Sequence, residues 1–229
     1  MRIASYNIRK AVGLDWRRDP ERIMRVLDEI DADVIALQEA DIRTGERAGV
    51  LPLDRMLEEH GYQLVDLAVR PDSHGWHGNV LFVRNPYLIT ESRRIDLPSL
   101  EPRGAVSALL ERPRVEIIGV HLALDPVTRR RQIARLASDI RAKSHATIVA
   151  GDFNQWSPRK TSLAPFGQVV SPGLSFHAAR PLAALDKFVV NGLSGTQKAW
   201  VHRTPSTRLA SDHLPIVMDV SLDHPDPSE

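Results

Sequence analysis

The chain has 229 residues, of which 42% are hydrophobic and 26% charged, as in an ordinary soluble globular protein of one large domain or two small ones. It contains no cysteine, which excludes disulfides, zinc–thiolate sites, iron–sulfur clusters and a thiol nucleophile. The formal net charge of +1 gives no overall attraction to nucleic acid, so any attraction to phosphate must come from local patches.

The first half of the chain predicts a strand, a helix and a second strand. Residues 2–8 alternate as a strand does, and Asp19-Pro20 is typical of a helix start, with Asp19 as N-cap. The helix that follows carries one apolar stripe, formed by Ile23, Val26, Leu27 and Ile30. Residues 33–37 form a continuous apolar run, typical of a buried strand, and end at Gln38-Glu39.

The rest of the chain is strand-rich. Asp125-Pro126 opens a second amphipathic helix, and residues 155–185 are read as a long surface excursion because they are rich in Pro, Gly and Ser. The other predicted elements are a helix over 53–60, stopped by Gly61, and strands over 62–69, 80–83, 106–110, 115–120, 147–150, 185–190 and 215–222. These elements predict a single α/β domain over residues 1–229, with an ordered core of about 2–222 and a frayed tail, DHPDPSE.

No targeting segment is expected. The N-terminus has neither a long apolar segment nor a small-residue cleavage site, so we expect no signal peptide. No apolar run approaches the roughly 18 residues of a membrane span. We therefore expect a cytoplasmic protein, and a monomer.

Polar residues gather at the ends of the predicted strands. Because consecutive strand ends can converge on one edge of a sheet, we expect these side chains to share a site. They are Asn7, Glu39, Asn79, His121, Asp152, Asn154, Asp186, Asp212 and His213.

This set of side chains suits hydrolysis of a phosphate ester. The oxygens of Glu39, Asp212 and Asn7 are hard donors that suit Mg²⁺ or Mn²⁺. Asp152 can orient or deprotonate an attacking water, and Asn154 can donate a hydrogen bond to the phosphate. His121 and His213 can stabilise charge on the phosphoryl oxygens, and Asp186 can orient His213.

Each of these residues taken alone has an ordinary structural explanation. Asn7 is a common strand-end residue, Glu39 a common solvated tip, and Asp186 a possible cap. His121 at a strand end is more often packed or solvated. The sharpest local signal is Ser211-Asp212-His213, although three residues can match by chance.

The ordered set of motifs resembles the endonuclease/exonuclease/phosphatase superfamily, which includes exonuclease III-like and deoxyribonuclease I-like enzymes. The resemblance runs from about residue 2 to 222, on the segments SYNIR, DVIALQE, GNVLFVR, VHL, GDFN, LDKFVV and SDHLPIVMDV in the order of the family. It implies an α/β (α+β) fold, a four-layer arrangement in which two β-sheets form a sandwich flanked by helices. It also implies a metal-dependent hydrolase of phosphoric esters, most simply a phosphodiesterase.

The resemblance also implies a role for each site residue. Glu39 would be the principal metal ligand, with Asn7 and Asp212 close to the metal. Asp152 would activate the water. The phosphate would be held by Asn154 and His121, while His213, paired with Asp186, would stabilise the transition state.

Two departures from the family pattern argue against a role in DNA repair. Ile8, Arg9 and Lys10 follow the first-strand asparagine, where some DNA-processing members carry an acid. His121 stands where members that act on abasic DNA often have tyrosine. The histidine is more similar to deoxyribonuclease, sphingomyelinase and phosphatase members.

The sequence leaves the substrate open. The loops at 9–18, 71–79 and 155–185 are expected to face the site, with aromatic residues that can stack on bases, touch acyl chains or pack the loops. Packing is the preferred reading for Trp156. Arg103, Asn79, Trp76 and His74 are candidate substrate-binding residues, although an ordinary ion pair explains Arg103 better.

Three functions compete. A phosphodiesterase for nucleic acid or for lipid head groups and small molecules is preferred over a phosphomonoesterase of inositol-phosphate or nucleotide type. A catalytically silent binding module is the third, but it would be expected to have lost Glu39, Asp152 or His213, and all three are present. With carboxylates as ligand and base, activity is expected to fall in acid.

Overall fold

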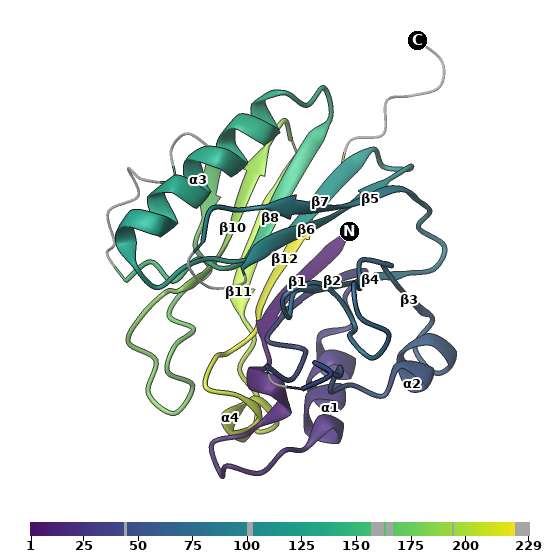
Figure 1. The fold of residues 1–229 in the computed structure, drawn as a ribbon, viewed down its shortest axis with the longest axis vertical. Coiled ribbons are helices and arrows are strands. Elements are labelled where there is room, and N and C mark those ends of the chain that lie inside the picture. The colour runs from purple at the N-terminus through teal and green to yellow at the C-terminus, as the bar shows by residue number, and fades with distance from the viewer. Residues whose placement is uncertain (44, 100–102, 157–162, 164–166, 194, 223–229) are drawn as a thin grey trace.

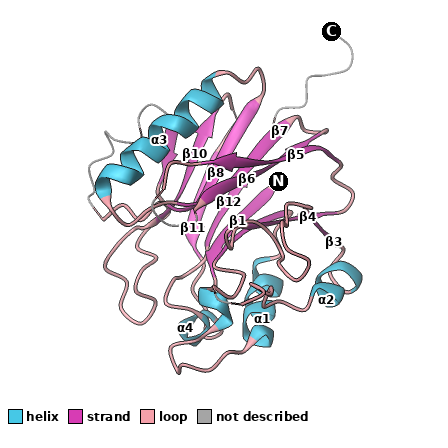
Figure 2. Cartoon of the chain, viewed as in Figure 1, coloured by secondary structure: helices cyan, strands magenta, loops and turns pink. Residues whose placement is uncertain are grey.

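Two six-stranded sheets pack face to face in the computed structural model, which describes residues 1–43, 45–99, 103–156, 163, 167–193 and 195–222 (Figures 1 and 2). The first sheet has the order β11 (Gln197–Val201), β12 (Ile216–Val220), β1 (Arg2–Asn7), β2 (Val34–Gln38), β4 (Val80–Arg84) and β3 (Tyr62–Leu64). The second has the order β5 (Ile89–Asp96), β6 (Gly104–Leu110), β7 (Val115–His121), β8 (Ala146–Asp152), β10 (Asp186–Asn191) and β9 (Gln168–Val170).

Both sheets are mixed. In the first sheet β1 runs parallel to β2 and antiparallel to β12, and in the second β7 runs parallel to β8, which is antiparallel to β10. The central strands read as apolar runs because both of their faces are buried. In β1, for example, Ile3 points between the sheets while Ala4 and Tyr6 point to the opposite side.

Helices cover the outer face of each sheet. Helix α1 (Pro20–Ile30) begins where predicted, since the Asp19 side chain accepts a hydrogen bond of 3.0 Å from the backbone N–H of Arg22. Its buried stripe packs on the first sheet with α2 (Leu53–Glu58), and α3 (Pro126–Arg141) packs on the second. Figure 1 shows α3 on one side of the sandwich and α1, α2 and the short α4 (Thr207–Ala210) on the other. The expected four-layer α/β sandwich is confirmed.

The structure differs from the sequence expectation mainly at sheet edges. The strand expected over 62–69 ends at Leu64, which pairs with Phe82 of β4. Because β4 already begins at Val80, it is too short to pair with a strand that continues to residue 69. Besides β9, which lies within the stretch 155–185 expected to be a loop, two strands were not predicted, β5 and β11. Both lie at sheet edges and carry the polar sequences ITESRRID and QKAWV, which lack a clear apolar alternation.

Other expectations fall partly or wholly outside the described residues. Residues 155–185 contain the strand β9 in their described part, whereas Phe166 and the tail 223–229 lie outside it. In the part of the chain that the structure describes, the helices lack the length and apolar character needed to cross a membrane.

Candidate active site

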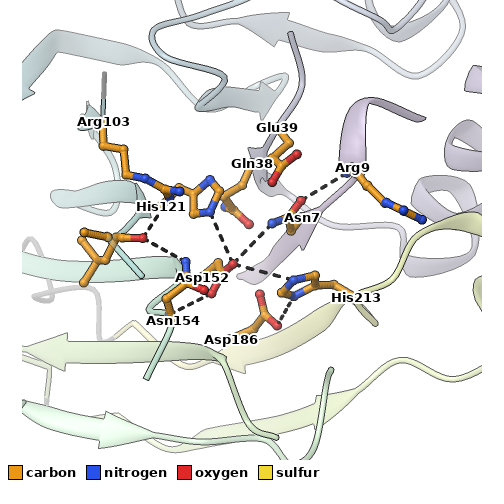
Figure 3. A network of polar contacts seen from close by, with 12 residues as sticks. Asn7, Arg9, Gln38, Glu39, Arg103, His121, Asp152, Asn154, Asp186 and His213 are labelled. Carbon is orange, nitrogen blue, oxygen red and sulfur yellow. Dashed lines mark hydrogen bonds and ion pairs between the residues drawn. The ribbon is translucent and has the colours of Figure 1, made fainter. Parts of the chain in front are cut away.

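Strand register brings three predicted site residues into one row. The parallel pairing of β7 with β8 sets His121 opposite Asp152, and the antiparallel pairing of β10 with β8 sets Asp186 opposite the same Asp152. Adjacent partners in a sheet have neighbouring side chains. The second sheet therefore supplies a histidine and two carboxylates at one edge (Figure 3).

Asp152 lies at the centre of the polar network. Its Oδ2 lies 3.5 Å from His121 Nε2 and 3.7 Å from His213 Nε2, and it accepts a 3.3 Å hydrogen bond from Asn7 Nδ2. Its Oδ1 accepts a 2.8 Å bond from the backbone N–H of Asn154, which closes an Asx turn. The carboxylate is thus fixed in direction by both sheets, because Asn7 ends β1 and Asp152 ends β8.

His213 is held by a buried carboxylate. Its Nδ1 lies 2.9 Å from Asp186 Oδ2, which also accepts a 2.5 Å hydrogen bond from the Ser175 hydroxyl. The ring of Phe176 packs against the imidazole with centroids 4.9 Å apart. The Asp186–His213 pairing predicted by the resemblance is therefore present, and the Nε2 atom is turned towards Asp152 (Figure 3).

Burial and charge separate the two histidines. Burial alone would lower the pKa of His213, but the charge and hydrogen bond of Asp186 and the charge of Asp152 raise this pKa to about 10. Burial lowers the pKa of His121 to about 4, since the nearby Asp152 only partly offsets it. At neutral pH the site therefore pairs a cationic His213 with a neutral His121, an arrangement suited to divided roles in charge stabilisation.

The expected metal ligands come from the first sheet and from the segment before β12. Glu39 directly follows β2 in a left-handed conformation (φ 53°), and the last residue of β2, Gln38, pairs with the buried Asn7. Burial opposes the ionisation of Glu39, but the charges of His121, Lys10 and Arg43 lower its pKa to about 2. The Asp212 carboxylate lies 3.5 Å from Arg9 Nε. Carboxylate and amide oxygens are donors that suit Mg²⁺ or Mn²⁺.

A cluster of two carboxylates and a histidine in the site is less suited to a metal. Side-chain ligand atoms of Asp152, Asp186 and His213 lie within 4.8 Å of one another. A metal-binding histidine must be neutral, whereas His213 is held as an imidazolium by Asp186. This cluster therefore fits an acid–base pair beside a metal better than the metal site itself.

Several contacts in the site were not predicted from the sequence. Lys10 forms an ion pair with Glu39, and its backbone N–H donates to Glu39 O at 2.8 Å. Ser175 supports Asp186, and the Ser211 hydroxyl donates to Asn7 O at 2.7 Å. Arg9, Lys10 and Ala11 all have positive φ, an uncommon conformation for non-glycine residues that often marks functional segments. Short polar residues such as Ser175 carry no pattern by which the sequence could have revealed them.

The candidate substrate-binding residues divide into two groups. His74 and Asn79 are buried and support loops: His74 Nε2 accepts from the backbone N–H of Leu51, and Asn79 Nδ2 donates to Gly104 O. Neither of them lines the cavity beside the site. That cavity is lined by Trp76 and Arg103, together with Glu39 and His121.

The remaining loop residues have defined contacts. Trp156 touches Phe176 edge-on but is 60% exposed. It is therefore not buried, as the expected packing role would require. Trp16 is 77% exposed and stacks under the Arg9 guanidinium. Arg129 and Arg130 donate to backbone oxygens near the start of α3.

The family model described as the Endonuclease/Exonuclease/phosphatase family matches residues 4–213. The chain belongs to this family. The match runs from β1 to His213 and so contains every catalytic and metal candidate named above, and family members are hydrolases that act on phosphate esters.

Solved structures of low sequence identity share the fold of this family member. An endonuclease/exonuclease/phosphatase from Beutenbergia cavernae is 20% identical, with a TM-score of 0.73 over 97% of this chain and 71% of the other. The human Nocturnin catalytic domain is 19% identical, with a TM-score of 0.69 over 96% and 94%. A mannosyl-6-phosphatase of Bacteroides thetaiotaomicron is 18% identical, with a TM-score of 0.69 over 97% and 100%. A sequence search of curated proteins found no match.

Proposed function

We propose that this family member is a metal-dependent phosphodiesterase that cleaves a P–O bond with an activated water. The observation that carries the proposal is the position of Asp152, 3.5 Å from His121 and 3.7 Å from His213, with Asp186 fixing the second histidine. A carboxylate between one cationic and one neutral histidine matches the needs of water attack on phosphorus.

The protein groups divide the reaction as follows. Asp152 orients the water and accepts its proton as the water oxygen bonds to phosphorus. The cationic His213 and the neutral His121 stabilise the charge that builds on the phosphoryl oxygens, and the bond to the leaving oxygen breaks. Asp186 is a positioning residue, because it holds His213 and has no access to the substrate at 0% exposure.

Glu39, Asn7 and Asp212 would hold the metal. A bound divalent cation would polarise the phosphoryl oxygen and stabilise the leaving alkoxide. Lys10 forms an ion pair with Glu39, so a bound metal would compete with the Lys10 ammonium group for this carboxylate. Asn154 Nδ2 donates to Leu122 O at 2.9 Å, which leaves its second N–H for a phosphate oxygen.

Hydrolysis of two simple esters tests this proposal. Bis(4-nitrophenyl) phosphate and 4-nitrophenyl phosphate are compared with Mg²⁺, with Mn²⁺ and with EDTA. We expect the diester to be cleaved in the presence of metal and to be stable in EDTA. Preferential cleavage of the monoester would replace the proposal with a phosphomonoesterase, and cleavage unaffected by EDTA would contradict metal dependence.

A further inference from the structure

A cationic cavity adjoins the candidate active site. Its volume is about 550 Å³, and Glu39 and His121 form the wall that it shares with the catalytic groups. Four arginines line it: Arg43, Arg47, Arg70 and Arg103. The cavity therefore opens directly beside the place where a scissile phosphate would lie.

The acidic groups of this cavity do not balance the arginines. Among the described lining residues, the carboxylates are Glu39 and Asp41. Asp41 is 6% exposed, and its two oxygens accept bonds of 2.6 Å from the Ser73 hydroxyl and 3.0 Å from the backbone N–H of His74. Glu39 already faces Lys10 as well as Arg43. Among the described lining residues, the guanidinium groups therefore outnumber the carboxylates.

Separate chain segments hold the arginines around the cavity. Arg70 donates a 3.0 Å hydrogen bond to Gly45 O, which ties the loop before β4 to the loop that carries Arg43 and Arg47. Arg47 and His77 line the same cavity, and the pKa of His77 is lowered by burial and by the charge of Arg47. On the other side Arg103 donates to Leu122 O at 2.9 Å, just beyond His121.

We propose that the arginine cavity binds a second phosphate group of the substrate, so that the preferred substrate is a phosphodiester with another phosphate close to the scissile one. The inference rests on the proposed phosphodiesterase function and names the substrate class for the same site. Guanidinium groups form paired hydrogen bonds with phosphate oxygens. An acyl chain in the same place would cover charged groups without pairing them, which is unfavourable.

Two matched chromogenic diesters test the proposal. Thymidine 5′-(4-nitrophenyl phosphate) carries one phosphate, and its 3′-phosphorylated form adds the second. We expect the wild type to hydrolyse the second compound with a kcat/KM higher by about tenfold or more, the effect of one or two charged hydrogen bonds. The double variant Arg47→Ala/Arg70→Ala should lose this preference, so that its kcat/KM values for the two compounds become similar.

The control is Arg25→Ala, which removes an exposed arginine from α1 and should keep the preference. An Arg47→Lys/Arg70→Lys variant, which keeps the charges, should retain part of it. Equal kcat/KM values for the two compounds in the wild type, or an unchanged preference in the alanine variant, would overturn the proposal.

Calorimetric titration with pyrophosphate in EDTA separates this inference from the proposed function. Pyrophosphate binding to the wild type that is lost in the alanine variant supports the cavity proposal. If neither diester is hydrolysed while this binding is seen, only the proposed phosphodiesterase function is refuted. Absence of binding overturns the cavity proposal. Competition by a thymidine tetranucleotide or by inositol 1,4-bisphosphate then identifies the source of the second phosphate as a nucleic-acid strand or a small molecule.

Discussion

Asp186 controls both the direction and the charge of the His213 ring. It is fully buried, and its Oδ2 accepts from His213 and from Ser175. An Asp186→Asn variant should lower kcat by about 10²–10⁴-fold with little change in KM, as when a histidine loses its orienting carboxylate. Asp66→Asn, on an exposed loop, should leave kcat unchanged.

Nuclear magnetic resonance titration of His213 distinguishes positioning from a general loss of structure. Burial opposes the charge on His213, but Asp186, with smaller contributions from Asp152 and Asp212, raises the His213 pKa to about 10, so the variant should show a pKa closer to the ordinary value of about 6.5. A folded variant in which both the His213 pKa and kcat match the wild type would refute the role given to Asp186.

The absence of a side chain at Gly104 leaves space for the Trp76 ring beside the cavity. A Cβ atom at position 104 would lie 1.9 Å from a carbon of the Trp76 ring, so the strand can only approach the ring without a side chain. Gly104→Ala should reduce the free energy of unfolding by about 1–3 kcal/mol, the usual cost of overpacking, measured by urea denaturation. In a Trp76→Ala background the same substitution should cost much less; an equal cost in both backgrounds would show that the ring is not the obstacle.

At the scale of elements, a network of ion pairs connects α3 to the second sheet. Arg93 of β5 lies 2.8 Å from Glu116 of β7 and 2.5 Å from Asp139 of α3. Glu116 is 2% exposed and also lies 3.6 Å from Lys143 and 3.1 Å from His145, so Arg93→Ala would remove part of the compensation of a buried carboxylate. We expect a loss of stability at the lower end of the ~3–5 kcal/mol range for broken buried pairs, since the Arg93 side chain is partly exposed. A loss below about 0.5 kcal/mol, typical of surface substitutions, would contradict this role.

The same network predicts how stability depends on pH. Burial opposes the ionisation of Glu116, but hydrogen bonds from His145, Ser107 and Arg93 lower its pKa below the ordinary 4.5. A carboxylate whose pKa is lower in the folded state contributes stability above its unfolded pKa, and this contribution is lost as the pH falls through the folded value. The free energy of unfolding should therefore decrease below about pH 4.5, and Glu116→Gln should make this decrease less steep. An unchanged slope in that variant would refute the assignment.

The elements that could be predicted are those whose sequence reflects burial. The alternation in β1, the apolar run of β2, the short strand β8 and the caps Asp19 and Asp125 were predicted at the correct positions, because a central strand or a capped helix start leaves a local pattern. The edge strands β5 and β11 have exposed polar residues and leave no such pattern. Their presence depends on the neighbouring strand rather than on their own sequence.

At the scale of the whole molecule, the candidate site exists because strand ends of both sheets, which pack face to face, lie at the same end of the sandwich. Asn7 and Glu39 come from the first sheet, and His121, Asp152 and Asp186 from the second. Their residue types and strand-end positions were visible in the sequence. The contacts of Lys10 with Glu39 and of Ser175 with Asp186 were not, since they depend on how distant loops approach one another.

The central claim is that Asp152 activates water for metal-dependent cleavage of a phosphodiester. The most direct test is the initial rate of bis(4-nitrophenyl) phosphate hydrolysis in Mg²⁺ for the wild type, Asp152→Asn and the control Asp66→Asn. We predict that Asp152→Asn lowers the rate by about 10²-fold or more while the control keeps the wild-type rate. A folded Asp152→Asn protein that cleaves the diester as fast as the wild type would contradict the account.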